Sequence, residues 1–257
     1  MLTNFKYGKT PARFDKRTLR FSKYLTPALP VPPAEFAWLP QTQYGAMLND
    51  NIGDCTIAAT GHAIQIWTKF VFDYYTAPDN DIQTAYIAVT GEEGQAYNPA
   101  DGSGDNGCNM IDVLNYWRNT GISGHKISGY ASLNVGNLAE MRASVMIFGG
   151  VYTGINVPAY LEPLFNDNSI VWDVAKPGDD TTSVGGHCIW ILKYSDEQGW
   201  VYFVSWGEIY RMTFALLLQL ADEWYAVDSP DFFRNGKTPL GFDQVAMQSD
   251  LEVIVNT

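Results

Sequence analysis

The amino-acid sequence predicts an α+β protein with two lobes, in which helices come first and strands follow. Apolar residues recur at helical spacing from residue 55 onwards. After Gly149, short runs rich in β-branched and aromatic residues replace that pattern. Hydrophobic residues make up 46% of the 257 residues and charged residues 17%, which suits a chain that buries a core and excludes a disordered one. Helices followed by strands favour the α+β class.

Four helices are expected before the strands begin. Residues 55–72 are rich in Ala and Ile at helical spacing, and Asp54 is a good N-cap for them. The same spacing predicts helices over residues 81–89, 110–119 and 135–148.

The second half of the chain is expected to be mainly β-structure. Strands are predicted over residues 151–155, 188–194 and 200–206. Thr213 then caps a last helix, which we expect to run to about Trp224.

Residues 90–109 are rich in Gly, Asn and Asp and are predicted to form a loop. Oxygen-bearing residues from Asp101 to Asp112 approach the spacing of a calcium loop, but its sixth-position Gly and its bidentate Glu are missing. The three histidines and three cysteines show no metal-ligand spacing. We therefore expect an ordinary loop, no metal and no cofactor.

Charge is distributed unevenly along the chain. Residues 1–23 contain one acidic residue, Asp15, and seven basic residues: Lys6, Lys9, Arg13, Lys16, Arg17, Arg20 and Lys23. The remaining nine basic and 27 acidic residues give the rest of the chain a strong negative charge, which disfavours nucleic acid and anionic membranes as partners. We interpret residues 1–32 as a basic arm with a Pro-rich linker. The arm is either a strap on its own acidic body or a contact to neighbouring subunits.

The arm precedes a domain over residues 33–257, with a helical lobe at about 45–135 and a β lobe at about 136–257. The apolar runs are too short to cross a bilayer, and the N-terminus lacks an apolar signal core. Three cysteines cannot all pair within one chain. We therefore expect a protein of the reducing cytoplasm, or one exported by a route without a cleaved signal, with at least one free thiol.

Cys55 and His187 are the strongest candidates for catalysis. Cys55 occupies the first turn of the predicted helix, where backbone amides favour a thiolate, and His187 enters an apolar strand after two glycines. A carboxylate at Asp54 would oppose the thiolate unless it caps the helix. Taken alone, Cys55 would be a small buried apolar residue, and we interpret His62 as a packing residue of the same helix.

Five segments, in the same order, resemble the papain-like cysteine peptidases. Asn49 to Ala59 is similar to the Gln-Gly-x-Cys-Gly-Ser-Cys-Trp-Ala-Phe-Ala segment around their nucleophile. The other four segments lie at residues 33–38, 104–109, 185–194 and 204–207. The resemblance implies a papain-like two-lobed fold, with a helical lobe, an antiparallel β lobe and a cleft between Cys55 and His187.

The resemblance also implies roles for other residues. Asn49 replaces the glutamine that donates to the oxyanion, together with the Cys55 amide. Trp206, Asn109 and Gly186 are implied to line the substrate cleft.

Departures from the family pattern are equally informative. The asparagine that orients the histidine falls at Val204, which cannot form a hydrogen bond, and Ser205 is expected to point to the opposite strand face. Asp173 and Glu208 are the remaining alternatives. Cys188 should face away from the cleft. Only about 32 residues precede the body, so we expect no long inhibitory segment.

These observations favour a thiol hydrolase that cleaves peptide or amide bonds of a protein or peptide substrate through Cys55 and His187. The alternative is a catalytically degenerate, papain-fold structural or binding protein of a large assembly, such as a virion component assembled in the cytoplasm. Val204 and the basic arm favour that alternative.

Overall fold

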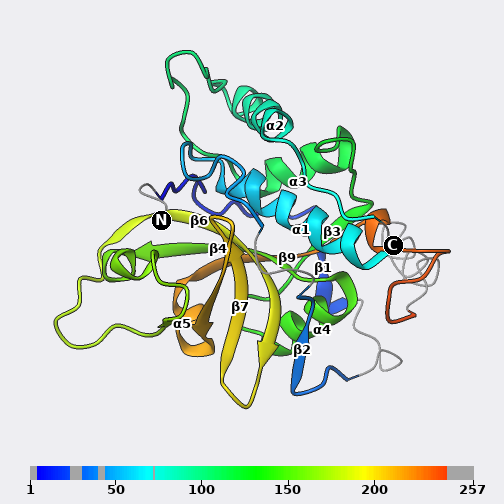
Figure 1. Ribbon diagram of the computed structural model, residues 1–257, viewed down its shortest axis with the longest axis vertical. Coiled ribbons are helices and arrows are strands. Elements are labelled where there is room, and N and C mark those ends of the chain that lie inside the picture. Colours follow the sequence, from blue (N-terminus) through cyan, green and yellow to red (C-terminus); the bar gives the residue numbers. More distant parts are fainter. Residues whose placement is uncertain (1–4, 24–30, 40–43, 72, 242–257) are drawn as a thin grey trace.

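The computed structural model describes residues 5–23, 31–39, 44–71 and 73–241. Figure 1 shows three helices gathered on one side of the molecule and the central strands on the other. Residues 27–30 of the expected linker and residues 242–257 of the expected β lobe lie outside the described residues. Within the described part of the chain, no helix is both long and apolar enough to span a bilayer.

The four helices expected in the first part of the chain are all present. They are α1 (Cys55–Val71), α2 (Asp79–Glu92), α3 (Met110–Asn119) and α4 (Leu138–Phe148). Asn109 caps α3 by accepting a hydrogen bond from the Ile111 amide, and Asn137 caps α4 in the same way. Helix α1 is buried over nearly its whole circumference, which explains its continuous apolar sequence.

The strands in the described residues form one sheet. They are β1 (Leu19–Arg20), β2 (Glu35–Ala37), β3 (Gly129–Ser132), β4 (Val151–Pro158), β5 (Val171–Trp172), β6 (Ser183–Ser195), β7 (Trp200–Ser205), β8 (Glu208–Thr213) and β9 (Ala221–Asp228). Their order is β1-β3-β9-β4-β6-β7-β8-β5, with β2 paired to β6. Most pairs are antiparallel; β1 with β3 and β5 with β8 are parallel. The α+β prediction is confirmed.

The expected last helix is too long. Thr213 does cap α5 (Phe214–Leu220), but the chain becomes β9 at Ala221. Strand β9 lies between β3 and β4, so its backbone forms ladders on both sides. Its aromatic and β-branched residues suit a strand, and the tertiary pairing overrides the helical spacing.

The core joins α1 to the sheet. Trp67 of α1 stacks on Trp117 of α3 and meets Trp190 of β6 edge to face, with ring centroids 5.4 Å apart in both pairs. This contact fixes α1 across β6, so the N-terminus of α1 lies close to the residues around His187. Figure 1 shows α1 passing over these strands.

Candidate active site

Cys55 begins α1 at the junction between the helix and the sheet. The carbonyl of Asp54 accepts the amides of Ile57 and Ala58 at 2.7 and 3.0 Å, which starts the helix. The backbones of Cys188 and Gly8 partly oppose the rise in the pKa of Cys55 that burial causes. The Gly8 amide itself donates to the Gly186 carbonyl at 3.1 Å.

The loop before Cys55 is held from a distant segment. Oδ1 of Asp105 accepts the Gly53 amide at 2.8 Å and the Tyr86 hydroxyl at 2.7 Å. Asp105 belongs to the loop in which calcium was considered. Among the described residues, no group of side chains could hold a metal ion. Asp105 instead positions the turn that leads into α1.

Asp54 does not cap α1 through its side chain as expected. Both carboxylate oxygens are buried and, within the described residues, have no hydrogen-bond partner. Burial raises the pKa of Asp54 well above its ordinary value, which favours the neutral acid. A protonated Asp54 removes the unfavourable charge beside Cys55 that the sequence suggested.

His187 lies on β6 and is oriented by Ser205. Its Nε2 is 2.6 Å from the Ser205 hydroxyl oxygen. The expectation that Ser205 faces the other side of the strand is wrong. Trp190 pairs with Val204, and continuing this register one residue places Ser205 on the same face as His187.

The other suggested partners lie elsewhere. Val204 is fully buried, Asp173 accepts from the Thr213 hydroxyl, and Glu208 accepts from the Asn168 amide. With Nε2 protonated and donating to Ser205, Nδ1 of His187 keeps a free lone pair. Nδ1 is buried and makes no hydrogen bond in the described part of the chain, so it is not bonded to the Cys55 thiol in this form.

Trp206 forms the wall beside His187. The two rings stack with centroids 4.3 Å apart and an interplanar angle of 17°. Trp206 and Gly207 form the two-residue turn between β7 and β8, and both have positive φ, 45° and 83°. A tryptophan in this region of backbone space is strained. The strained turn places the indole over the imidazole.

Asn49 is buried behind the site. Its side-chain amide donates to the Ile52 carbonyl at 3.2 Å, and its own carbonyl accepts the Lys6 amide at 3.3 Å. One of its two N–H groups is therefore already engaged. Its role as an oxyanion donor stays a prediction.

Residues 5–11 of the arm fill the cleft. The amides of Gly8 and Lys9 donate to the Gly186 carbonyl at 3.1 and 3.0 Å. The Cys108 amide donates to the Gly8 carbonyl at 2.7 Å, and the Thr10 amide donates to the Cys108 carbonyl at 3.1 Å. The arm therefore forms an isolated parallel β-bridge, in which Lys9 pairs with Cys108.

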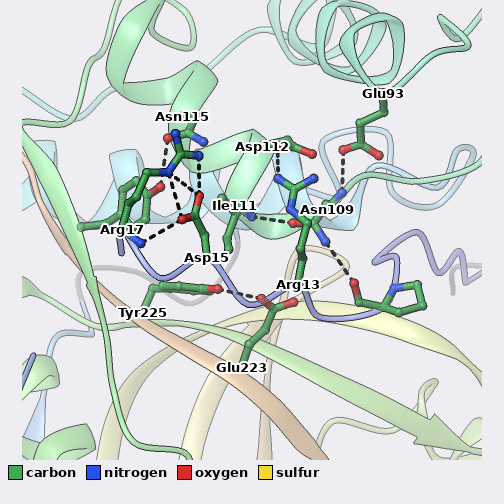
Figure 2. Close-up of polar contacts among 12 residues, drawn as sticks. Arg13, Asp15, Arg17, Glu93, Asn109, Ile111, Asp112, Asn115, Glu223 and Tyr225 are labelled. Atoms are coloured by element: carbon green, nitrogen blue, oxygen red, sulfur yellow. Dashed lines mark hydrogen bonds and ion pairs between the residues drawn. The ribbon is translucent and has the colours of Figure 1, made fainter. Parts of the chain in front are cut away.

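All three residues implied to line the substrate cleft hold this arm. Gly186 accepts the two amides of the arm, Trp206 donates from its indole to the Lys6 carbonyl at 3.3 Å, and the Asn109 side chain donates to the Pro11 carbonyl at 3.0 Å. Figure 2 shows Asn109 between this carbonyl and Glu93, and Arg13 of the arm directed at Asp112. The predicted substrate residues thus bind a peptide in this structure, and the peptide is the chain's own.

The fit at Gly8 leaves no room for a side chain. A Cβ on Gly8 would lie 1.6 Å from the Gly53 carbonyl oxygen, and a Cβ on Gly107 would lie 1.9 Å from the Gly8 carbonyl oxygen. Both neighbours are backbone, so neither can rotate away. Glycine at these positions allows the two backbones to approach closely.

Burial favours the neutral forms of Cys55 and His187 in this structure. It raises the pKa of Cys55 to about 12, while the amides of Cys188 and Gly8 oppose that rise only in part. Burial also lowers the pKa of His187 to about 3, and the nearby His62 adds to the effect. Both residues are 1% exposed. Both shifts disfavour the thiolate–imidazolium pair that was expected from the sequence.

Residues 6–11 of the arm bind the chain's own body, which agrees with the interpretation of the arm as a strap. Cys188 is buried and pairs with Gly154 in the ladder between β4 and β6. His62 is a packing residue as expected, with Nε2 3.1 Å from the Gly45 carbonyl.

The fold is shared with solved cysteine proteases. Xylellain, a cysteine protease from Xylella fastidiosa, superposes with a TM-score of 0.66 at 17% identity, over 88% of this chain and 96% of that chain. Digestive procathepsin L 3 of Tenebrio molitor larval midgut superposes with a TM-score of 0.58 at 16% identity, over 88% of this chain and 77% of that chain.

A third similar structure contains the cysteine protease and lectin-like domains of Cwp84, a surface layer associated protein of Clostridium difficile. It gives a TM-score of 0.59 at 12% identity, over 89% of this chain and 57% of that chain. No protein-family model and no curated protein matches the sequence significantly. The likeness establishes the papain-like fold that the motifs indicated.

Proposed function

We propose that this protein is a thiol-dependent hydrolase of peptide bonds, and that its own N-terminal arm keeps it latent. The observation that carries the proposal is the binding of residues 6–10 to the backbone of Asn49, Cys108 and Gly186, the residue before His187. A cleft that binds one extended peptide through backbone hydrogen bonds is suited to bind another. The papain-like fold supports the same reaction class.

Each residue then has a chemical role once the arm leaves. Water reaches Cys55 and His187, so both pKa values return towards their ordinary range and a thiolate–imidazolium pair becomes accessible. Cys55 attacks the peptide carbonyl, while Nδ1 of His187 first holds the thiol proton and then gives it to the leaving amine. Ser205 holds the ring through Nε2, and the Cys55 amide stabilises the oxyanion.

A second candidate is a papain-fold binding protein without catalysis. It is favoured by the complete burial of Cys55 and by a serine where an amide would orient the histidine. In that function the arm would be a permanent part of the fold. The arm was also expected to contact neighbouring subunits, in a virion or another assembly built in the cytoplasm. That expectation stays a prediction.

The Gly8→Ala variant separates these two functions. The added methyl group weakens the docking of the arm without changing Cys55, His187 or Ser205. We expect the full-length variant to cleave a library of internally quenched peptides roughly five- to 150-fold faster than the natural chain, in proportion to the larger open fraction. Adding Cys55→Ala should abolish this activity.

Lys16→Ala is the matched control, because Lys16 is an exposed arm residue outside the segment that fills the cleft. Its activity should equal that of the natural chain. If Gly8→Ala exposes Cys55 to alkylation and still cleaves no peptide, the hydrolase proposal fails and the binding protein is the better account.

A further inference from the structure

The arm places one lysine in a closed acidic pocket. The Lys9 side chain is 0% exposed, and its Nζ lies 2.8 Å from Asp222 Oδ2 and 3.4 Å from Glu223 Oε1. Nζ also donates to the Thr10 carbonyl at 3.1 Å. The ammonium group is therefore neutralised by two carboxylates at the start of β9.

The pocket is shaped for a long basic side chain. A Cβ on Gly154 of β4 would lie 2.2 Å from Lys9 Cε, so the glycine leaves room for the lysine stem. The Tyr225 hydroxyl donates to Glu223 at 2.8 Å, as Figure 2 shows, and the Asn156 amide donates to Asp222 at 3.3 Å. These bonds orient the carboxylates before any cation arrives.

The pocket lies beside the candidate nucleophile. Lys9 directly follows Gly8, where an added Cβ would lie 1.6 Å from the carbonyl oxygen of Gly53, two residues before Cys55. Gly154 pairs in register with Cys188, the neighbour of His187. The pocket thus receives the side chain one residue away from the peptide unit that covers Cys55.

We propose that the pocket formed by Gly154, Asp222 and Glu223 selects peptides carrying a basic side chain, lysine above all, and that Lys9 imitates such a ligand. The claim that such peptides are substrates rests on the proposed function. The claim that the pocket binds them preferentially does not depend on catalysis.

The buried carboxylates explain why the pocket would bind a lysine side chain more tightly than a neutral one. Glu223 is only 6% exposed, and burial raises its pKa while Lys9 opposes that rise. When the arm leaves, a buried carboxylate loses its cation, which is costly. A neutral side chain of similar length leaves that cost in place, whereas a lysine removes it.

The test measures binding to the full-length Gly8→Ala/Cys55→Ala protein, which cannot cleave the probe. The probe is a fluorescent, end-blocked peptide with the sequence of residues 5–11, Phe-Lys-Tyr-Gly-Lys-Thr-Pro. It is compared with the same peptide carrying norleucine in place of the second lysine. We expect norleucine to raise the Kd at least tenfold, as measured by fluorescence anisotropy.

Removing the charges should remove the preference. With Asp222→Asn/Glu223→Gln added, we expect the two peptides to bind within about threefold of each other, because no buried charge remains to be neutralised. Glu197→Gln, an exposed acidic residue outside the pocket, should keep the full preference. Equal binding of both peptides, binding of neither, or a preference that survives the neutral variant would overturn the proposal.

Turnover by the Gly8→Ala protein, with Cys55 intact, keeps the two proposals distinguishable. Selective binding of the lysine peptide without any cleavage would refute the hydrolase and leave the pocket standing. Cleavage of peptides with no preference for a basic residue would refute the pocket and leave the hydrolase standing.

Discussion

The Gly8→Ala substitution should expose Cys55 by a measurable amount. In the natural chain, five backbone–backbone hydrogen bonds and two from the Trp206 and Asn109 side chains hold residues 6–11. At a net value of about 1 kcal/mol each, they stabilise the docked arm by roughly 7 kcal/mol. The cleft is therefore open only in a very small fraction of molecules.

The methyl group of an alanine at position 8 weakens this docking. Its Cβ would lie 1.6 Å from the Gly53 carbonyl oxygen, well inside van der Waals contact, and the backbone on both sides must shift. Overpacking of this kind costs about 1–3 kcal/mol. Because about 1.4 kcal/mol corresponds to tenfold, the open fraction should rise roughly five- to 150-fold.

The assay is the rate of Cys55 alkylation by iodoacetamide at pH 8, followed peptide by peptide with mass spectrometry. In the closed form a pKa of about 12 leaves very little thiolate, so modification proceeds through the open form. Lys16→Ala, a change at an exposed arm residue outside the docked segment, is the matched control. An unchanged rate for Cys55 in Gly8→Ala would refute the docking argument.

Three further predictions concern the supporting residues. Ser205→Ala leaves Nε2 of His187 buried without its partner, so we expect urea denaturation to show a loss of about 1–3 kcal/mol in unfolding free energy; no loss would mean that the hydrogen bond is unimportant. Burial lowers the pKa of His187 from 6.5 in the unfolded chain to about 3 in the folded protein. Between pH 6.5 and pH 3 the unfolded chain therefore binds one proton more at His187, so the unfolding free energy falls as the pH falls. Relative to His187→Gln, the natural chain should lose about 2 kcal/mol between pH 7 and pH 5, and parallel pH profiles would contradict this. Asp105→Ala removes the acceptor of the Gly53 amide and the Tyr86 hydroxyl, so we expect it to lower the unfolding free energy in urea by about 1–3 kcal/mol. Asp101→Ala, at an exposed residue of the same loop, should lower it much less. An equal loss in both variants would contradict the role given to Asp105.

Local signals in the sequence were sufficient for several elements. The bounds of α3 follow from its apolar spacing and from Asn109, whose side chain caps it. Cys55 at the start of α1 and His187 within β6 could each be placed because each lies in a short segment with its own helix or strand pattern. These features depend on neighbours along the chain, which a single sequence displays directly.

Other features depended on contacts between distant segments. Residues 221–224 were expected to end a helix but begin β9, because β3 and β4 offer pairing on both sides. Ser205, and not Val204, meets His187, because the register of β6 with β7 decides which face each residue occupies. A shift of one residue in register reverses that assignment, and no local pattern specifies it.

The arm is the clearest case of this division. Its basic charge and its separation from the body are visible in the sequence, and they are compatible with a strap or with a contact to another subunit. Its path over Cys55 follows from a fit of backbone to backbone at Gly8 and from two carboxylates of β9 that receive Lys9. The net charge of the arm attracts any acidic surface, so it does not specify where the arm binds. Steric fit and buried ion pairs do specify the place, but they form only when the residues around the cleft are folded together.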